Sequence, residues 1–170
     1  MDFVSTRGMD KELIEEILKD AKKFDSKKDF SQTLKGKILG NLFFEPSTRT
    51  QFSFQGAMER LGGGVLGFST IDGTSVKKGE TLIDTIKIIS GYVDCIVIRH
   101  SKEGAAKLAA EVSPVPVVNA GDGSHDHPTQ TLLDIYTIKK SFKELDGLNV
   151  GICGDLRYGR TGRPLSMALS

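Results

Sequence analysis

The sequence contains no tryptophan, only two cysteines and almost no excess of charge of either sign. Its 23 basic and 22 acidic side chains leave a formal net charge of +1. Because binding to a nucleic-acid backbone needs a clustered positive excess, we expect no nucleic-acid partner, and any positive site must be local. The sequence also lacks a secretion signal and an apolar run of about 18 residues, the length that spans a membrane. We therefore expect a cytoplasmic protein with no membrane segment.

The two cysteines, Cys95 and Cys153, lie in apolar runs that are typical of buried strands. Disulfides are rare in the reducing cytoplasm, and nothing in the sequence indicates export. We interpret both residues as reduced thiols of the hydrophobic core.

Short apolar runs alternate with helical patterns along the chain. Apolar spacing from Leu13 to Ala21 predicts an opening helix. The apolar runs cover residues 37–44, 65–69, 95–100, 116–121 and 148–154, and the predicted helices between them cover residues 48–61, 80–91, 103–111 and 128–142. This alternation predicts an α/β fold in which helices cover both faces of a parallel sheet, giving three layers (αβα).

The chain of 170 residues is long enough for one core of ordinary size and short for two complete domains. A charged, irregular stretch over residues 139–147 is typical of a linker, and the fifth apolar run follows it. We predict one domain over residues 1–146 and the beginning of a second, truncated domain over residues 147–170.

Polar clusters follow every predicted strand. They are Ser47–Thr50, residues 72–80, Arg99 with His100, residues 121–130 and residues 154–161. Ligands of open parallel sheets bind beyond the carboxyl ends of the strands. The sequence therefore predicts a site at this edge of the sheet.

The first cluster follows Pro46 and combines hydroxyls with an arginine. Ser47 or Thr48 could simply cap a helix. Arg49, however, falls in the first turn, where the helix dipole disfavours a cation unless an anion binds at the same N-terminus. Hydroxyls, free N–H groups and a guanidinium together favour a phosphate site.

Two further clusters leave alternatives open. Arg99 ends an apolar strand, where a cation needs either a structural ion pair or an anionic ligand. The loop that carries Ser75, Lys77 and Lys78 is either a solvated surface loop or a mobile segment. A mobile segment could close over a ligand or reach a neighbouring subunit.

His127 precedes Pro128, which places it at or just before a helix N-terminus. A loop histidine is usually polar surface, but the dipole at this position lowers its pKa and lets a neutral imidazole polarise a carbonyl. Gln130 can both donate and accept, as recognition of an amide requires. Phosphate beside a polarised carbonyl indicates acyl or carbamoyl transfer by direct attack.

The sequence shows no metal-ligand spacing, no Walker loop and no dinucleotide-binding glycine pattern. We therefore expect neither a metal nor a cofactor.

Several ordered motifs closely resemble the carbamoyltransferase family, and within it the catalytic chains of aspartate carbamoyltransferases. They are FFEPSTRTQFSF (43–54), SVKKGETLIDT (75–85), VDCIVIRHSKEGAAKLA (93–109), NAGDGSHDHPTQTLLDIYTI (119–138) and GDLRYGRT (154–161). Ornithine carbamoyltransferases share the Ser-Thr-Arg-Thr and His-Pro-x-Gln patterns. The KKGET and DLRYGRT segments favour aspartate as the acceptor.

The resemblance implies a role for each matching residue in binding carbamoyl phosphate. The residues that match the phosphate-binding motif are Ser47, Thr48, Arg49 and Thr50. Arg49 would also steady the leaving oxygen, and Arg99 would contact both the phosphate and the carbonyl oxygen. His127, helped by Thr50, would contact the carbonyl oxygen, and Gln130 would recognise the carbamoyl amide.

The resemblance also implies a shared site. Ser75 and Lys78 match residues that the family inserts into the active site of an adjacent subunit, which implies a homotrimer. Arg160 matches a ligand of an aspartate carboxylate, and Glu45 matches an acidic residue of an interdomain network. The implied reaction is attack by the amino group of L-aspartate on carbamoyl phosphate, giving N-carbamoyl-L-aspartate and phosphate in pyrimidine synthesis.

Two other readings stay open. Family chains carry a complete second domain with further aspartate ligands, so this chain could be a carbamoyl phosphate binding module that catalyses nothing alone. Ornithine carbamoyltransferase is the second alternative. Residue types do not decide whether regulatory chains bind.

Overall fold

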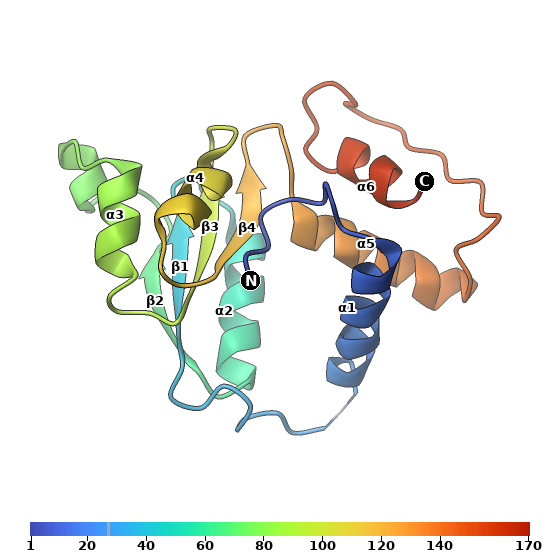
Figure 1. The fold of residues 1–170 in the computed structure, drawn as a ribbon, viewed down its shortest axis with the longest axis horizontal. Coiled ribbons are helices and arrows are strands. Elements are labelled where there is room, and N and C mark those ends of the chain that lie inside the picture. Colours follow the sequence, from blue (N-terminus) through green and yellow to red (C-terminus); the bar gives the residue numbers. More distant parts are fainter. Residues whose placement is uncertain (27) are drawn as a thin grey trace.

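The computed structural model describes residues 1–26 and 28–170 (Figure 1). The elements in chain order are α1 (Lys11–Phe24), β1 (Ile38–Phe43), α2 (Thr48–Arg60), β2 (Gly64–Phe68), the 3-10 helix η1 (Ser75–Lys78), α3 (Leu82–Ile89), β3 (Cys95–His100), α4 (Ala105–Val112), β4 (Val117–Asp122), α5 (Pro128–Phe142) and α6 (Gly162–Ala168). The first four predicted strands and the helices between them are confirmed, with boundaries that differ by only a few residues.

The strands form one sheet in the order β2-β1-β3-β4, and every pair of neighbours is parallel. From β1 the chain moves outward to β2 and then returns across β1 to β3. The direction of winding therefore reverses between β1 and β3. Ligands of such sheets bind at this switch point, beyond the carboxyl ends of the two strands.

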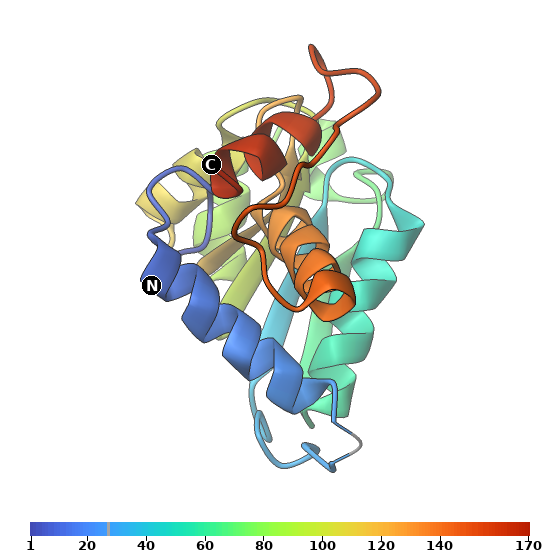
Figure 2. The same cartoon turned by 90° about the vertical axis from the view of Figure 1, so that its right-hand side faces the viewer.

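Helices cover both faces of the sheet, as the apolar runs predict. On one face, α3 and α4 pack against a core that includes Leu42, Ile96 and Ile98. On the other face, Phe43 and Val97 belong to a second cluster. There α2 packs against β1 and β2, α5 packs against β4, and α1 packs against α5 (Figure 2). Because both faces are buried, the central strands are apolar at nearly every position. The three-layer α/β fold is confirmed.

The helices differ in how their N-termini are capped. The side chains of Asp10 and Thr81 accept hydrogen bonds from the first turns of α1 and α3. Ser47 and His127 hold the corresponding positions of α2 and α5, and neither side chain caps its helix. At the carboxyl edge of the sheet, α2 and α5 therefore keep backbone N–H groups free of side-chain caps. Within the described part of the chain, no helix combines the length and apolarity needed to cross a membrane.

The fifth apolar run, residues 148–154, is not a strand. Its backbone is irregular, and Leu148 and Val150 are 36% and 44% exposed. A strand needs a neighbour for its backbone N–H and C=O groups, and this run pairs with no strand among residues 1–26 and 28–170. Cys153 is exposed, so its interpretation as a core thiol is wrong. Cys95 lies half-buried in β3, and burial raises the pKa of its thiol.

Candidate functional site

Three of the sequence-predicted residues converge on one backbone position at the carboxyl edge of the sheet. A methyl group at Gly121 would lie 3.3 Å from Nη1 of Arg99, Nη1 of Arg160 and Cδ2 of His127. These side chains come from the end of β3, from the irregular segment before α6 and from the N-terminus of α5. Gly121 has a φ of +113°, a conformation that favours glycine. The absence of a side chain at this position leaves room for the three groups to approach.

A β-bulge brings Gly121 into this place. Ile98 pairs with Asn119 and His100 pairs with Asp122, so β4 has one residue more than β3 between these pairs. The Gly121 N–H donates to Oδ1 of Asn119 at 2.7 Å, which stabilises the bulge. Bulges at sheet edges commonly redirect side chains beside a site. Sequence reasoning did not single out Gly121 or Asn119, although a glycine at the end of an apolar run is a signal for such a feature.

Glu45 joins the two arginines of the site. Its Oε1 accepts from Nη2 of Arg99 at 3.0 Å and from Nη2 of Arg160 at 2.7 Å. Partial burial by itself would raise the pKa of the Glu45 carboxyl. The hydrogen bonds and positive charges of Arg160 and Arg99 outweigh this effect, so the pKa lies below its ordinary value. Of the two alternatives for Arg99, the ion pair is present, and it leaves part of the guanidinium unengaged. Within the described residues, the buried Nε of Arg99 has no hydrogen-bond partner.

His127 is buried, with 6% of its surface exposed, and it occupies the N-cap position of α5. Burial lowers the pKa of its imidazole to about 4, and the charges of Arg99 and Arg160 add to the effect. The sequence predicted a lowered pKa from the helix dipole, whereas burial and the two arginines are the dominant causes. His127 is therefore neutral near pH 7 and can donate a hydrogen bond to a carbonyl oxygen.

This buried histidine predicts a pH dependence of stability. The pKa of about 4 lies below the ordinary value of 6.5, so the unfolded chain binds the proton first as the pH falls. The contribution of neutral His127 to the free energy of unfolding is fully present above about pH 6.5. It is lost as the pH falls toward about 4, and the free energy of unfolding decreases by at most about 3 kcal/mol. Urea unfolding at pH 7 and pH 4.5 should show a larger loss for the wild type than for His127→Gln. Equal losses in the two proteins would contradict the assignment, and His125→Gln serves as the control.

The N-terminus of α2 lies beside the end of β3. Phe43 pairs with Arg99 in the sheet, and the N–H of Phe44 donates to the carbonyl oxygen of Arg99 at 2.9 Å. Thr48 and Arg49 are exposed in the first turn of α2, while Ser47 and Thr50 are half-buried. No acidic residue occupies this turn. The free N–H groups and Arg49 thus form a cationic helix end next to the switch point.

The remaining predicted residues are not joined to this group. Nε2 of Gln130 donates to Oδ1 of Asp134 at 2.9 Å, one turn further along α5. Ser75 and Lys78 are exposed in η1. Among residues 1–26 and 28–170, no hydrogen bond or ion pair connects Ser75 or Lys78 with Arg99, His127 or Arg160. In the same part of the chain, no cluster of three or more His, Cys, Asp or Glu side chains is placed to hold a metal.

The fold and the site define an α/β protein with a cluster of cationic side chains at the switch point of a parallel sheet, beside a neutral, buried histidine. The sequence model of the family described as "Aspartate/ornithine carbamoyltransferase, carbamoyl-P binding domain" matches residues 1–140. The chain belongs to this family.

Curated and structurally characterised relatives agree with this assignment. The chain is 58% identical over 172 aligned residues to the "Aspartate carbamoyltransferase catalytic subunit" of Thermococcus onnurineus, covering 99% of this chain and 56% of the relative. It superposes on the catalytic subunit of M. jannaschii aspartate transcarbamoylase with a TM-score of 0.91 and 52% identity, again covering 99% of this chain and 56% of the other. The Trypanosoma cruzi enzyme in complex with carbamoyl phosphate and aspartate gives a TM-score of 0.91 at 38% identity, with the same coverage. The chain thus spans little more than half the length of these relatives.

Proposed function

We propose that this chain is the carbamoyl phosphate half of an aspartate carbamoyltransferase catalytic subunit. Residues 1–146 form the carbamoyl-phosphate-binding domain, and residues 147–170 begin the aspartate-binding domain. The observation that carries the proposal is the convergence of Arg99, Arg160 and neutral His127 on Gly121. The Trypanosoma cruzi relative, whose structure is in complex with carbamoyl phosphate and aspartate, supports these two substrates.

The phosphate of carbamoyl phosphate binds at the N-terminus of α2. Backbone N–H groups and the hydroxyls of Ser47, Thr48 and Thr50 donate to its oxygens, and Arg49 supplies the positive charge. The uncapped helix end and the absence of an acidic residue in its first turn support this placement. Arg49 also stabilises the oxygen that leaves with the phosphate.

The carbonyl oxygen faces His127 and Arg99. Attack by the amino group of L-aspartate moves negative charge onto this oxygen, and the neutral imidazole and the guanidinium donate to it. Thr50 assists His127, and Gln130 exchanges its bond with Asp134 for the carbamoyl amide. The carbon–oxygen bond to the phosphate then breaks, and one proton of the attacking nitrogen passes to the departing phosphate. This gives N-carbamoyl-L-aspartate and phosphate, a step of pyrimidine synthesis. Arg160, oriented by Glu45, binds a carboxylate of aspartate.

Ser75 and Lys78 act in the site of an adjacent subunit. Both side chains are exposed, and η1 is followed by Gly79, whose φ of +100° marks a tight turn. Because no contact joins Ser75 or Lys78 to the site of their own chain, a neighbouring subunit would supply the equivalent residues. The assembly proposed is the homotrimer that the family resemblance implies, in the cytoplasm.

A product assay tests the proposal. The full-length protein is given labelled carbamoyl phosphate with L-aspartate or L-ornithine in parallel reactions. We expect labelled N-carbamoyl-L-aspartate only. Carbamoyl ornithine as the product would instead assign the protein to ornithine carbamoyltransferases. Binding of carbamoyl phosphate without any product would favour a non-catalytic module.

Arg49→Ala is expected to weaken the binding of carbamoyl phosphate about 100-fold, because a charge-assisted contact to the phosphate is lost. Isothermal titration of the full-length protein measures the dissociation constant. Arg60→Ala is the matched control, because Arg60 lies in the last turn of the same helix, away from the switch point. Unchanged affinity in Arg49→Ala would place the phosphate elsewhere.

A further inference from the structure

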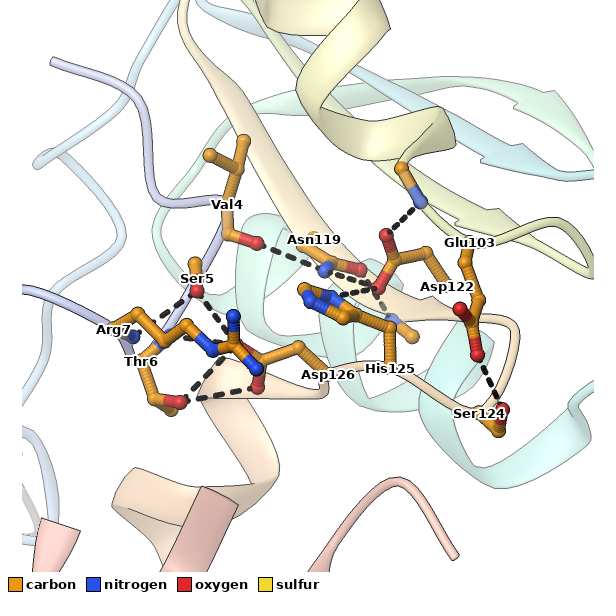
Figure 3. Close-up of polar contacts among 12 residues, drawn as sticks. Val4, Ser5, Thr6, Arg7, Glu103, Asn119, Asp122, Ser124, His125 and Asp126 are labelled. Carbon is orange, nitrogen blue, oxygen red and sulfur yellow. Dashed lines mark hydrogen bonds and ion pairs between the residues drawn. The ribbon is translucent and has the colours of Figure 1, made fainter. Parts of the chain in front are cut away.

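The segment Phe3–Thr6 runs from the first residues of β4 to the loop before α5, far from its own place in the sequence (Figure 3). The N–H of Phe3 donates to the carbonyl oxygen of Val117 at 2.7 Å, and the N–H of Asn119 donates to the carbonyl oxygen of Phe3 at 2.9 Å. Nδ2 of Asn119 donates to the carbonyl oxygen of Val4 at 2.9 Å. Phe3 therefore forms an isolated parallel bridge with Val118 of β4, close in the chain to the bulge that holds Gly121.

The same segment holds Asp126, the residue directly before His127. Asp126 is 2% exposed, and its Oδ2 accepts from Oγ of Ser5 at 2.8 Å, from the N–H of Thr6 at 2.8 Å and from Oγ1 of Thr6 at 3.1 Å. The N–H of Arg7 donates to Oγ of Ser5 at 3.0 Å, which turns the Ser5 hydroxyl proton toward the carboxylate. A buried carboxylate is costly unless it is hydrogen-bonded, so these three donors fix its position.

The loop that leads to His127 is attached at both of its ends. At the first end, Oδ2 of Asp122 accepts from the N–H of Gly104 at 2.9 Å, and Oδ1 accepts from Nδ2 of Asn119 at 3.0 Å. The N–H of Asp122 also donates to the carbonyl oxygen of Asp126 at 3.2 Å, which closes the loop. At the second end, the side chain of Asp126 is bound to the N-terminal segment. Figure 3 shows the two carboxylates on opposite sides of the loop.

We propose that Asp126 is a positioning residue for His127 and that Ser5 and Thr6, by holding Asp126, make the N-terminal segment part of the active site. The backbone of His127 has φ −145° and ψ 74°, outside the helical region. Non-helical φ and ψ are usual for an N-cap residue, so the helix itself does not set the backbone of His127. The Asp126 contacts fix the peptide that enters His127, and so they fix the direction of the imidazole toward Gly121. For its kinetic readout this inference rests on the proposed carbamoyl transfer.

The kinetic test uses the full-length protein and four variants. Asp126→Asn keeps the shape of the side chain but places an amide N–H₂ against the Ser5 and Thr6 donors. We expect kcat to fall about tenfold, while KM for carbamoyl phosphate changes less than about twofold. Thr6→Ala should lower kcat about threefold, and Thr6→Ser, which keeps the hydroxyl, should restore it. Ser124→Ala is the control, because the Ser124 hydroxyl bonds Glu103 at the exposed side of the same loop.

Imidazole NMR signals of His127 provide a readout that needs no catalysis. They should shift in Asp126→Asn and Thr6→Ala, and should stay at their wild-type positions in Thr6→Ser and Ser124→Ala. Unchanged signals and unchanged kcat in Thr6→Ala would overturn the inference, even if Asp126→Asn did not fold. A wild-type protein that forms no carbamoyl aspartate would contradict the proposed function, while the imidazole signals would still decide the positioning role.

Discussion

His127→Ala is expected to lower kcat by about 10²–10³, the loss that follows removal of one donor from a developing oxyanion. His127 is buried, neutral near pH 7 and directed at the position where Arg99 and Arg160 meet. The affinity for carbamoyl phosphate should change by less than about fivefold, because the phosphate contacts at α2 remain. Steady-state kinetics and isothermal titration of the full-length protein separate the two quantities.

His125→Ala is the matched control for this variant. His125 lies in the same loop with its side chain 36% exposed, 3.8 Å from the carboxylate of Asp122 rather than at Gly121. Its removal should leave kcat near the wild-type value. If His127→Ala lost binding and turnover to the same degree, His127 would contribute to ground-state binding rather than to the transition state.

Most of the fold was predictable because local pattern and sheet topology agree. The apolar run that contains Ile96 and Ile98 predicts a strand buried on both faces, and the structure confirms β3. The run over residues 148–154 has the same pattern but is irregular. A strand depends on a neighbour, and hydrophobicity alone does not say whether that neighbour exists.

The residues of the candidate site were also only partly predictable from the sequence. Arg99 and His127 stand out in the sequence because cations and histidines are unusual at the ends of apolar strands and at the start of a helix. Gly121 gives only the weak signal of a glycine that ends an apolar run. Asp126 does not stand out at all, since its importance comes from contacts with a distant part of the chain. The Ser5 hydroxyl reaches Asp126 across a separation of 121 residues. Such pairings are tertiary and leave no periodic signal.

Gly121→Ala is expected to abolish most of the activity through a single methyl group. The methyl would lie 3.3 Å from each of Arg99, Arg160 and His127, and the φ of +113° would be strained for alanine by about 1–3 kcal/mol. The two arginines are bonded to Glu45 and have little freedom to withdraw. We therefore expect kcat/KM to fall by more than about 100-fold, because a small misplacement of reacting groups has an effect of this size.

Gly36→Ala separates the two causes of this loss, which are backbone strain at a positive φ and contact of the new methyl group with the site. Gly36 also has a positive φ, +79°, but a methyl group there would meet no atom within 4 Å, and the residue precedes β1 at the opposite edge of the sheet. Both variants should therefore lose free energy of unfolding in a urea titration, whereas only Gly121→Ala should lose kcat/KM. If the two lost activity in proportion to stability, backbone strain would explain the effect. Loss of activity in Gly121→Ala alone would indicate that the substrate binds next to Gly121, in contact with both arginines and the imidazole.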